Sequence, residues 1–215
     1  MTPGLRQAGR LAPFARERLA DSAPEAAVAL LGAVVRRREA DGTWSAVRVV
    51  ETEAYREDDP ASHSAAGRTA RTAPMFEQPG TAYVYRSYGM HWCLNVTAEP
   101  VGVGAAALVR AAVVLAGHER LRARRPAART DRDLLRGPGR LCQALAISAP
   151  DHDGIDLLSP AAEVQLLDDG FRPRAVVAGP RVGVRLAADV PWRFAVAEAA
   201  EVSAYRRHPR APLPG

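Results

Sequence analysis

The run from Trp44 to Tyr55 is the feature that most limits how this chain can fold. It reads as a strand, in which successive side chains point to opposite faces. One face would carry Val47, Val49, Glu51, Glu53 and Tyr55, and the other Arg48, Val50, Thr52 and Ala54. Another expected strand, Ala33 to Arg38, precedes it across Asp41-Gly42, a pair that favours a hairpin turn. The sequence therefore predicts a hairpin on which two carboxylates and a tyrosine share a face with two valines.

Further strand and helix signals follow along the chain. Ser22 and Glu25 have the spacing of a capping box, which predicts a helix that ends near Gly32. We expect strands at 81–87, 91–97, 175–178, 181–185 and 193–197, helices at 117–125 and 137–147, and a long loop at 56–80. Strands in runs with helices at their ends predict an α+β fold, a single compact domain with a mostly antiparallel sheet. The domain would span 21–205, after a partly ordered segment 1–20 and before a frayed tail 206–215.

The chain of 215 residues contains 29 basic side chains and no lysine, so all 29 are arginines. With 24 acidic residues the formal net charge is +5, which is weak evidence for a nucleic-acid partner by itself. Guanidinium groups favour planar, bidentate contacts to phosphate or carboxylate. Without lysine no side-chain amine can form a Schiff base, and only the Met1 α-amine remains for that chemistry.

Several classes of protein do not fit the sequence. No apolar run reaches the roughly 18 residues that a membrane helix needs, and Met1 to Leu11 lacks the apolar core of a secretion signal. Cys93 and Cys142 have neither metal-ligand spacing nor a disulfide framework, and their apolar surroundings suggest buried, inert thiols. The five histidines form no zinc-binding array, so we expect no metal.

Glu51, Glu53 and Arg110 are candidates for chemistry. A carboxylate on an apolar face can act as a general base, because burial disfavours its charge, but the same residue could lie on a solvated edge or in an ion pair. Arg110 interrupts the apolar run 105–114 and must pair or reach solvent. The two glutamates are its simplest partners. The pattern leaves a structural salt bridge and a carboxylate–arginine site equally open.

Two further segments could contact DNA. Tyr88-Gly89-Met90 joins two expected strands, and an exposed Tyr and Met at a turn suit a wedge that inserts between bases, unless they fold back on their own sheet. Gly137-Pro138 opens a helix whose free amides, with Arg140 in the first turn, could bind phosphate. Plain helix initiation explains the same residues.

Taken together and in this order, these segments resemble the alkyladenine DNA glycosylase family of 3-methyladenine DNA glycosylases, and a bacterial member in particular. The resemblance rests on VETEAY at 50–55, DPASHS at 59–64 and YVYRSYGMHWCLNV at 83–96. It continues through 108–111, 137–142 and 180–184, and runs from about 26 to 203. The first and third blocks are long and specific.

The resemblance implies a monofunctional DNA glycosylase of base excision repair, with one α+β domain, a curved antiparallel sheet flanked by helices, and no cofactor. Such an enzyme flips an alkylated or deaminated purine from duplex DNA and hydrolyses its N-glycosidic bond, leaving an abasic site. Glu53 would activate the water, and Arg110 would help to hold it. The base pocket would comprise Tyr55, His63, Tyr85 and Asn95, and the intercalating residues would be Tyr88 and Met90. Further water or phosphate contacts would involve Val202, Ser203, Gly139 and Arg140.

Two other functions remain open from the sequence: a non-catalytic nucleic-acid-binding module and a hydrolase of free nucleosides. A pure binder needs no Glu53–Arg110 pair, and a free nucleoside leaves no gap for Tyr88 to fill. The expected partner is double-stranded DNA that contains damaged purines, bound by a monomer in the cytoplasm at the nucleoid. Neither the range of lesions nor the role of Glu51 follows from the sequence.

Overall fold

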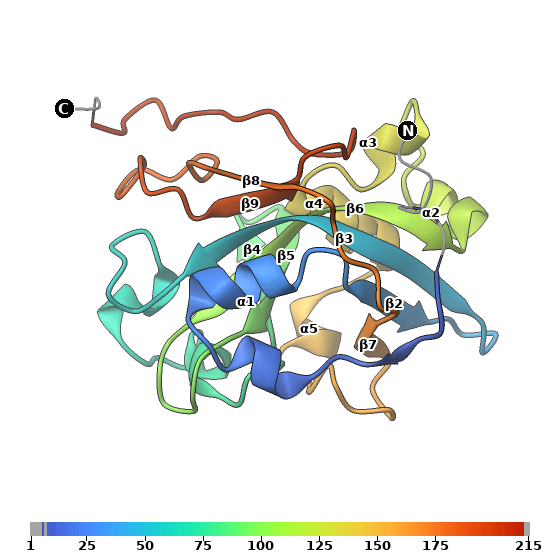
Figure 1. Ribbon diagram of the computed structural model, residues 1–215, viewed down its shortest axis with the longest axis horizontal. Coiled ribbons are helices and arrows are strands. Elements are labelled where there is room, and N and C mark those ends of the chain that lie inside the picture. The colour runs from blue at the N-terminus through green and yellow to red at the C-terminus, as the bar shows by residue number, and fades with distance from the viewer. Residues whose placement is uncertain (1–5, 7, 213–215) are drawn as a thin grey trace.

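In the computed structural model, which describes residue 6 and residues 8–212, the two longest strands lie side by side in the middle of one sheet (Figure 1). Strand β3 (Trp44–Tyr55) pairs antiparallel with β6 (Ala106–Ala116) in one register from Val47 to Tyr55, apart from a local irregularity at Glu51. The expected alternation is therefore preserved. The side chains of Glu51, Glu53 and Tyr55 share one face, while the Thr52 hydroxyl donates a hydrogen bond to the Ala27 carbonyl on the other.

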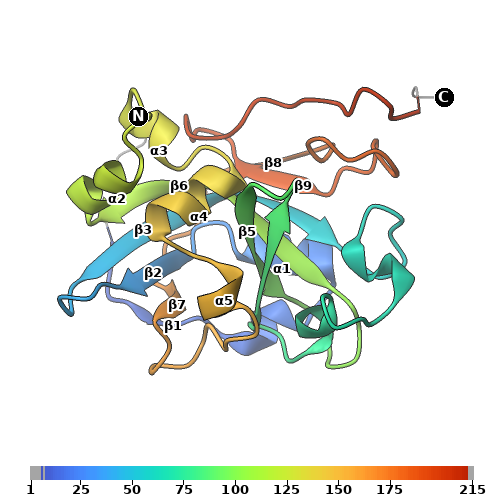
Figure 2. The same cartoon turned by 180° about the vertical axis from the view of Figure 1, so that it is seen from behind.

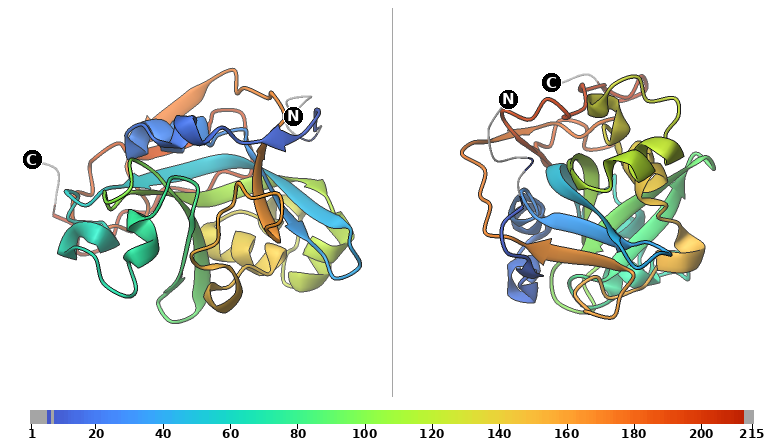
Figure 3. Two further views of the ribbon diagram at one scale, coloured as in Figure 1. Left: turned by 90° about the horizontal axis from the view of Figure 1, so that it is seen from below. Right: turned by 90° about the vertical axis from the view of Figure 1, so that its right-hand side faces the viewer.

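The described strands form one antiparallel sheet in the order β1-β7-β2-β3-β6-β5-β4, in which β9 pairs with β3 beyond the end of β2, and β8 pairs with β9. The other strands are β1 (Ala12–Pro13), β2 (Val34–Arg38), β4 (Ala82–Ser87), β5 (His91–Thr97), β7 (Val164–Asp168), β8 (Val176–Gly179) and β9 (Arg193–Val196). The sheet curls into a half-barrel (Figure 3). Together with the helices, this architecture confirms the α+β prediction.

Helices lie on both sides of the long strands. They are α1 (Ala23–Ala29), α2 (His118–Arg124), α3 (Asp131–Leu134), α4 (Pro138–Leu145) and α5 (Ala149–His152), with 3-10 turns at Arg16–Leu19, His63–Ala66 and Ala73–Phe76. Helix α1 covers β3 on one side and α4 lies on the opposite side (Figures 1 and 2). Leu30, Leu141 and Leu145 are fully buried in the main core, and burial of one such side chain contributes about 2 kcal/mol.

The local signals that start two of these elements are present as expected. The Ser22 backbone N–H donates to the Glu25 carboxylate at 3.2 Å in the first turn of α1, which confirms the capping box. Gly137, at φ 113°, adopts a conformation that favours glycine, and Pro138 begins α4 directly after it.

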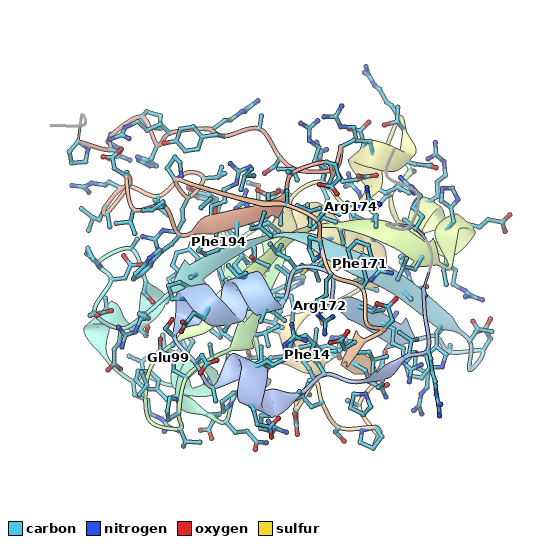
Figure 4. The ribbon with its side chains drawn as sticks, viewed as in Figure 1. Phe14, Glu99, Phe171, Arg172, Arg174 and Phe194 are labelled. Atoms are coloured by element: carbon cyan, nitrogen blue, oxygen red, sulfur yellow. The ribbon has the colours of Figure 1, made fainter. Side chains whose placement is uncertain are left out.

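A second, smaller core joins β3 to the chain that follows β7. Val50 packs there with Val113 and Val196, and Phe171 and Phe194 pack against this cluster (Figure 4). Arg48 stacks over the Phe171 ring at 4.3 Å and forms an ion pair with Asp169 at 2.8 Å. Both charged side chains are buried, so the attraction between them must offset the hydration energy that each charge loses on leaving water.

The structure differs from the sequence expectation in several elements. Residues 181–185 form a turn rather than a strand, because the polar groups of this segment bond to β3 and the loop after it instead of to a neighbouring strand. Strands β1, β6 and β7 are not among the expected strands, nor α3 and α5 among the expected helices, and β7 pairs with both β1 and β2.

The proposed ends of the domain at 21 and 205 stay a prediction. Residues 1–5, residue 7 and residues 213–215 lie outside the described part of the chain, and so do parts of the segment 1–20 and the tail 206–215. Within the described part, Phe14 and Leu19 are buried in the main core.

Candidate active site

A cavity of 650 Å³ opens where β3, β4, β5 and β6 meet the loop around residues 182–186. It brings together seven of the residues expected at the site: Glu53, Tyr55, His63, Tyr85, Tyr88, Asn95 and Arg110. Five others do not line it, namely Met90, Gly139, Arg140, Val202 and Ser203. The roles that we expect for all twelve stay predictions, whereas their positions can be described.

Glu53 is a buried carboxylate held by three donors. Its Oε2 accepts hydrogen bonds from the Tyr55 hydroxyl at 2.9 Å and from Arg110 Nη1 at 3.2 Å, and its Oε1 accepts one from the Val182 backbone N–H at 2.7 Å. These three contacts fix the orientation of a carboxylate that lines the cavity. Such an arrangement can present one oxygen to a water molecule in a fixed geometry.

Arg110 lies between the two glutamates, so the pairing expected from the sequence is confirmed with both. Its Nε donates to Glu51 Oε1 at 3.0 Å, its Nη1 to Glu53 and its Nη2 to the Ser203 hydroxyl at 3.2 Å. Burial disfavours the charged guanidinium, but the two carboxylates outweigh this effect and raise the pKa of Arg110. The side chain therefore stays cationic beside the cavity.

Glu51 lies behind Arg110 and does not line the cavity. Besides Arg110, it accepts hydrogen bonds from Arg193 Nε at 2.7 Å and from the Ser203 hydroxyl and backbone N–H at 2.8 and 2.9 Å. Burial alone would raise the pKa of Glu51, yet the nearby Arg110, the Ser203 N–H and Arg193 lower it. Glu51 is thus an ionised carboxylate whose bonding capacity is used within the protein.

Aromatic rings form the walls of the cavity. Tyr83 and Tyr85 stack with their centroids 5.5 Å apart, and the His63 ring meets Tyr85 edge-on at 4.5 Å. His63 Nδ1 lies 2.9 Å from the Tyr83 hydroxyl. Burial and the nearby Arg71 lower the pKa of His63, so its ring is neutral at pH 7. A neutral ring can pack against a flat aromatic ligand without repelling a cationic one.

The Tyr55 ring is supported from behind by Arg181. The guanidinium lies 4.7 Å from the ring centroid and forms a buried ion pair with Asp59, in which Nη2 donates to Oδ1 at 3.0 Å. Arg181 Nη1 also donates to the Ala54 carbonyl at 2.9 Å. These contacts fix the position of Arg181 in its loop. The next residue, Val182, donates its backbone N–H to Glu53.

Asn95 and Cys93 come from β5. The Asn95 side-chain amide donates to the Tyr83 carbonyl at 2.9 Å, which fixes its orientation at the cavity. Burial raises the pKa of the Cys93 thiol to about 11 and also raises that of Cys142, so both stay protonated at neutral pH. The two thiols are free and buried, as expected.

The turn between β4 and β5 projects two large apolar side chains into solvent. Tyr88 is 82% exposed and Met90 is 68% exposed. Tyr88 has φ 48° and Gly89 has φ 68°, and the Met90 N–H donates to the Ser87 carbonyl at 3.0 Å. Because a left-handed conformation is unfavourable for tyrosine, the tight turn holds Tyr88 in position at some cost in energy.

The first turn of α4 lies against the base of this hairpin. A Cβ on Gly139 would come within 2.8 Å of the His91 Cβ, so only glycine fits at this contact without a shift. Arg140 is about half exposed, and its guanidinium lies 3.7 Å from the Asp133 carboxylate. Its guanidinium therefore lies at the surface, in an ion pair with Asp133.

The C-terminal segment supports the glutamates from the side away from the cavity. Ser203 contacts Glu51, and its carbonyl accepts a hydrogen bond from Arg193 at 2.5 Å. The Val202 carbonyl accepts one from Arg136 Nε at 3.1 Å. The Val202 carbonyl, at a position expected to contact water or phosphate, is therefore hydrogen-bonded to the Arg136 guanidinium in this structure.

Two contributors to the site have no sequence signal that could have identified them. Val182 acts through its backbone N–H, which any residue except proline could supply, and Arg193 reaches Glu51 from 142 positions away. Arg181 and Asp59 do lie in blocks that resemble the family, and a strict search for charged pairs across those blocks could have found them.

Within residues 6 and 8–212, no three His, Cys, Asp or Glu side chains gather in a way that could hold a metal ion. No helix in the same residues is long and apolar enough to cross a membrane.

Comparison with known proteins gives one consistent picture. The model of the methylpurine-DNA glycosylase (MPG) family matches residues 17–200. A protein of Nocardia farcinica named "putative 3-methyladenine DNA glycosylase" is 50% identical over 203 residues, which cover 91% of this chain and 93% of the relative. Proteins of the same name from Mycolicibacterium paratuberculosis and Burkholderia lata are 45% and 49% identical, and the matches cover 94% and 73% of this chain and 97% and 75% of theirs.

Proposed function

The chain belongs to the methylpurine-DNA glycosylase family, and from that premise we propose that it removes damaged purines from double-stranded DNA. It hydrolyses the N-glycosidic bond, as a DNA-3-methyladenine glycosylase does, and leaves an abasic site. One observation carries the proposal: the buried carboxylate of Glu53 accepts three hydrogen bonds and lines a cavity with aromatic walls.

A purine rotated out of the helix would lie between Tyr55 on one side and His63 with Tyr85 on the other. Stacking on such rings is worth roughly 1–3 kcal/mol per base and does not depend strongly on the base. Alkylation at N3 or N7 gives the purine a positive charge, which favours contact with electron-rich rings. Asn95 would lie at the minor-groove edge of the purine, where the amino group of normal guanine would clash with it.

Glu53 would accept a proton from a water molecule that Arg110 helps to orient. As the glycosidic bond breaks, its electrons pass to the purine and the sugar becomes positively charged at C1′. The water oxygen then bonds to C1′, and its proton stays on Glu53. A cationic alkylated purine becomes neutral on leaving, so the reaction needs a base for water more than an acid for the leaving group.

The hairpin tip would help to keep the damaged base outside the helix. Unstacking a base costs a few kcal/mol, and a side chain that fills the gap offsets part of that cost. Tyr88 would occupy the gap, with Met90 beside it. A free nucleoside has no such gap, so the tip favours a duplex substrate over the nucleoside hydrolase alternative.

Arginines would hold the backbone of the DNA. Arg140 and the Gly139 amide lie at the start of α4, next to the hairpin, and could contact phosphate there. Binding through guanidinium groups would fall steeply with salt. The enzyme would work as a monomer, because its site must take in duplex DNA, and it would act at the nucleoid, where its chromosomal substrate lies.

The proposal is tested with a duplex that carries a single hypoxanthine or 1,N6-ethenoadenine, incubated with the protein and then cleaved in alkali at abasic sites. Methylated DNA is assayed in parallel for free 3-methyladenine. We expect base release from at least one of these substrates. If none releases a base while duplex binding is intact, the chain is a binding module and the proposed reaction is wrong.

A further inference from the structure

Glu51 and Glu53 have the same side chain and the same arginine partner but entirely different surroundings. Glu53 lines the cavity, whereas Glu51 is fully buried and accepts four hydrogen bonds, from Arg110, Arg193 and twice from Ser203. None of these partners lies in the cavity except Arg110. A second carboxylate so placed has no access to a substrate, so its contribution must pass through Arg110.

We propose that Glu51 is a positioning residue: it binds the Nε side of Arg110 and balances the arginine charge, so that only Nη1 faces Glu53. This inference rests on the proposed function of the same site. Glu51 would then do more than form a structural ion pair. It would orient the Arg110 guanidinium and also balance its charge.

The geometry supports the first half of the proposal. The planar guanidinium presents its donors in a fixed fork, so fixing one edge fixes the others. Glu51 accepts from Nε at 3.0 Å and Ser203 from Nη2 at 3.2 Å, which leaves Nη1 directed at Glu53 at 3.2 Å. Without Glu51, the guanidinium is free to turn and pair bidentately with Glu53, which would block the carboxylate oxygens that a water needs.

The charges support the second half. Glu51 and Glu53 face Arg110 and Arg193, two negative groups against two positive ones, all buried or nearly so. Charges in such an environment act over longer distances than they do in water. Loss of the Glu51 charge would leave a net positive cluster next to a sugar that becomes positive in the transition state. The same cluster would make it harder for Glu53, the proposed general base, to take up a proton.

Other charged and titratable groups also surround Glu53, and none of them replaces Glu51. They are Tyr55 on β3, Tyr83, Tyr85 and Arg86 on β4, Cys93 on β5, and His63, Arg71, Tyr88, Arg181, Arg185 and His208 around the cavity. Among the described residues, only Tyr55, Arg110 and the Val182 N–H donate hydrogen bonds to Glu53. Glu51 is therefore the negative group that balances Arg110 from behind.

The test is the pH dependence of base release under single-turnover conditions, measured for wild type, Glu51→Gln and Arg193→Gln. For Glu51→Gln we expect the acid limb of the profile to move down by about one pH unit and the plateau rate to fall about tenfold. The affinity for a duplex with an abasic site should change less than twofold. For Arg193→Gln we expect the acid limb to move in the opposite direction, because the cluster loses a positive charge.

The opposite directions of the two expected pH shifts distinguish an electrostatic role of Glu51 from a simple loosening of the site. Arg193→Gln removes one donor to Glu51 Oε1, and Glu51→Gln alters the acceptors at the same position, so a purely structural role would lower activity in both variants without moving the acid limbs in opposite directions. If Glu51→Gln does not fold, Arg193→Gln still decides, together with Glu51→Asp, which keeps the charge and should keep the wild-type limb. Circular dichroism and melting temperature report folding in each case.

Glu39→Gln is the matched control. Glu39 is also a buried carboxylate that accepts hydrogen bonds from a serine hydroxyl and an arginine, here Ser45 and Arg124, but it lies away from the cavity. It should lose stability and keep the wild-type profile. If wild type releases the base but the acid limbs of Glu51→Gln and Arg193→Gln do not move, this inference is overturned and the proposed function is not. No base release by wild type overturns the proposed function itself.

Discussion

The hydroxyl group of Tyr55 lies 2.9 Å from Oε2 of Glu53, the same oxygen that Arg110 contacts at 3.2 Å. One side chain therefore lines the cavity with its ring and orients the carboxylate with its hydroxyl. Burial and the charge of Glu53 raise the pKa of Tyr55, so the hydroxyl remains a donor at any physiological pH. The wall that would grip the base and the group that would activate water are joined by a single hydrogen bond.

Replacing Tyr55 with phenylalanine should separate these two tasks. The ring stays, so binding of a duplex with an abasic site or a lesion should change less than twofold. The lost hydrogen bond is worth about 1 kcal/mol, which predicts base release about fivefold slower. Single-turnover rates and filter-binding affinities check this, and a large loss of affinity with an unchanged rate would contradict it.

Replacing Glu53 with glutamine should abolish most of the chemistry. An amide cannot accept the proton from water, so base release should fall at least about a hundredfold, while binding of damaged duplex is retained. Glu39→Gln serves as the control for removal of a buried negative charge. Turnover close to that of wild type would remove Glu53 from the role of general base.

Replacing Tyr88 with alanine should weaken capture of the flipped base. The side chain is 82% exposed, so folding should be unaffected, and the loss of one stacking contact predicts base release from duplex about tenfold slower at subsaturating protein. The defect should vanish on a single-stranded substrate, which has no gap to fill. Val101→Ala, at another exposed apolar residue, is the control. Equal defects on both substrates would argue against a wedge.

The absence of lysine predicts no covalent intermediate. Base release by water leaves an intact abasic strand, whereas strand cleavage by a glycosylase needs an amine that forms a Schiff base. Borohydride added during turnover should therefore trap no protein–DNA adduct. A trapped adduct would identify the Met1 α-amine as a nucleophile, since no other amine exists in the chain, and blocking the N-terminus would then remove it.

The Arg48–Asp169 pair should set part of the acid stability. Hydrogen bonds from Arg48 lower the pKa of Asp169 to about 2, below the value near 3.9 of an unfolded chain. A lowered folded-state pKa gives stability that is present above about pH 4 and lost as the pH falls towards 2. In urea titrations, the stability difference between wild type and Asp169→Asn should shrink over that window.

The sequence predicted those parts of the fold that depend on local patterns. Strand β3, the β4–β5 hairpin and α4 follow from alternation, turn residues and a Gly-Pro start, all of which act within a few residues. Val182 and Val184 alternate as a strand would, yet the segment forms a turn because Arg181 bonds to Asp59 and Val182 to Glu53. Such contacts join residues more than a hundred positions apart, and no local pattern reports them.

The same distinction holds for the candidate site. Glu51, Glu53 and Arg110 stood out because charged residues are rare on apolar strands, and the structure joins them. Arg193 could not be recognised, because its contact with Glu51 joins positions far apart in the chain, and Ser203 came from the family resemblance alone, without its hydrogen bonds to Glu51. Charge on an apolar strand can be read from sequence, but its partners become visible only when the chain is folded.

The contact between Gly139 and His91 affects the position of the β4–β5 hairpin, whose tip we propose to insert into DNA. His91 begins β5 directly beyond the tip that carries Tyr88, and a methyl group at 139 would push against it. A larger residue at 139 would require His91 or the start of α4 to shift. The spacing between the hairpin that carries Tyr88 and this helix therefore depends on the absence of a side chain at Gly139.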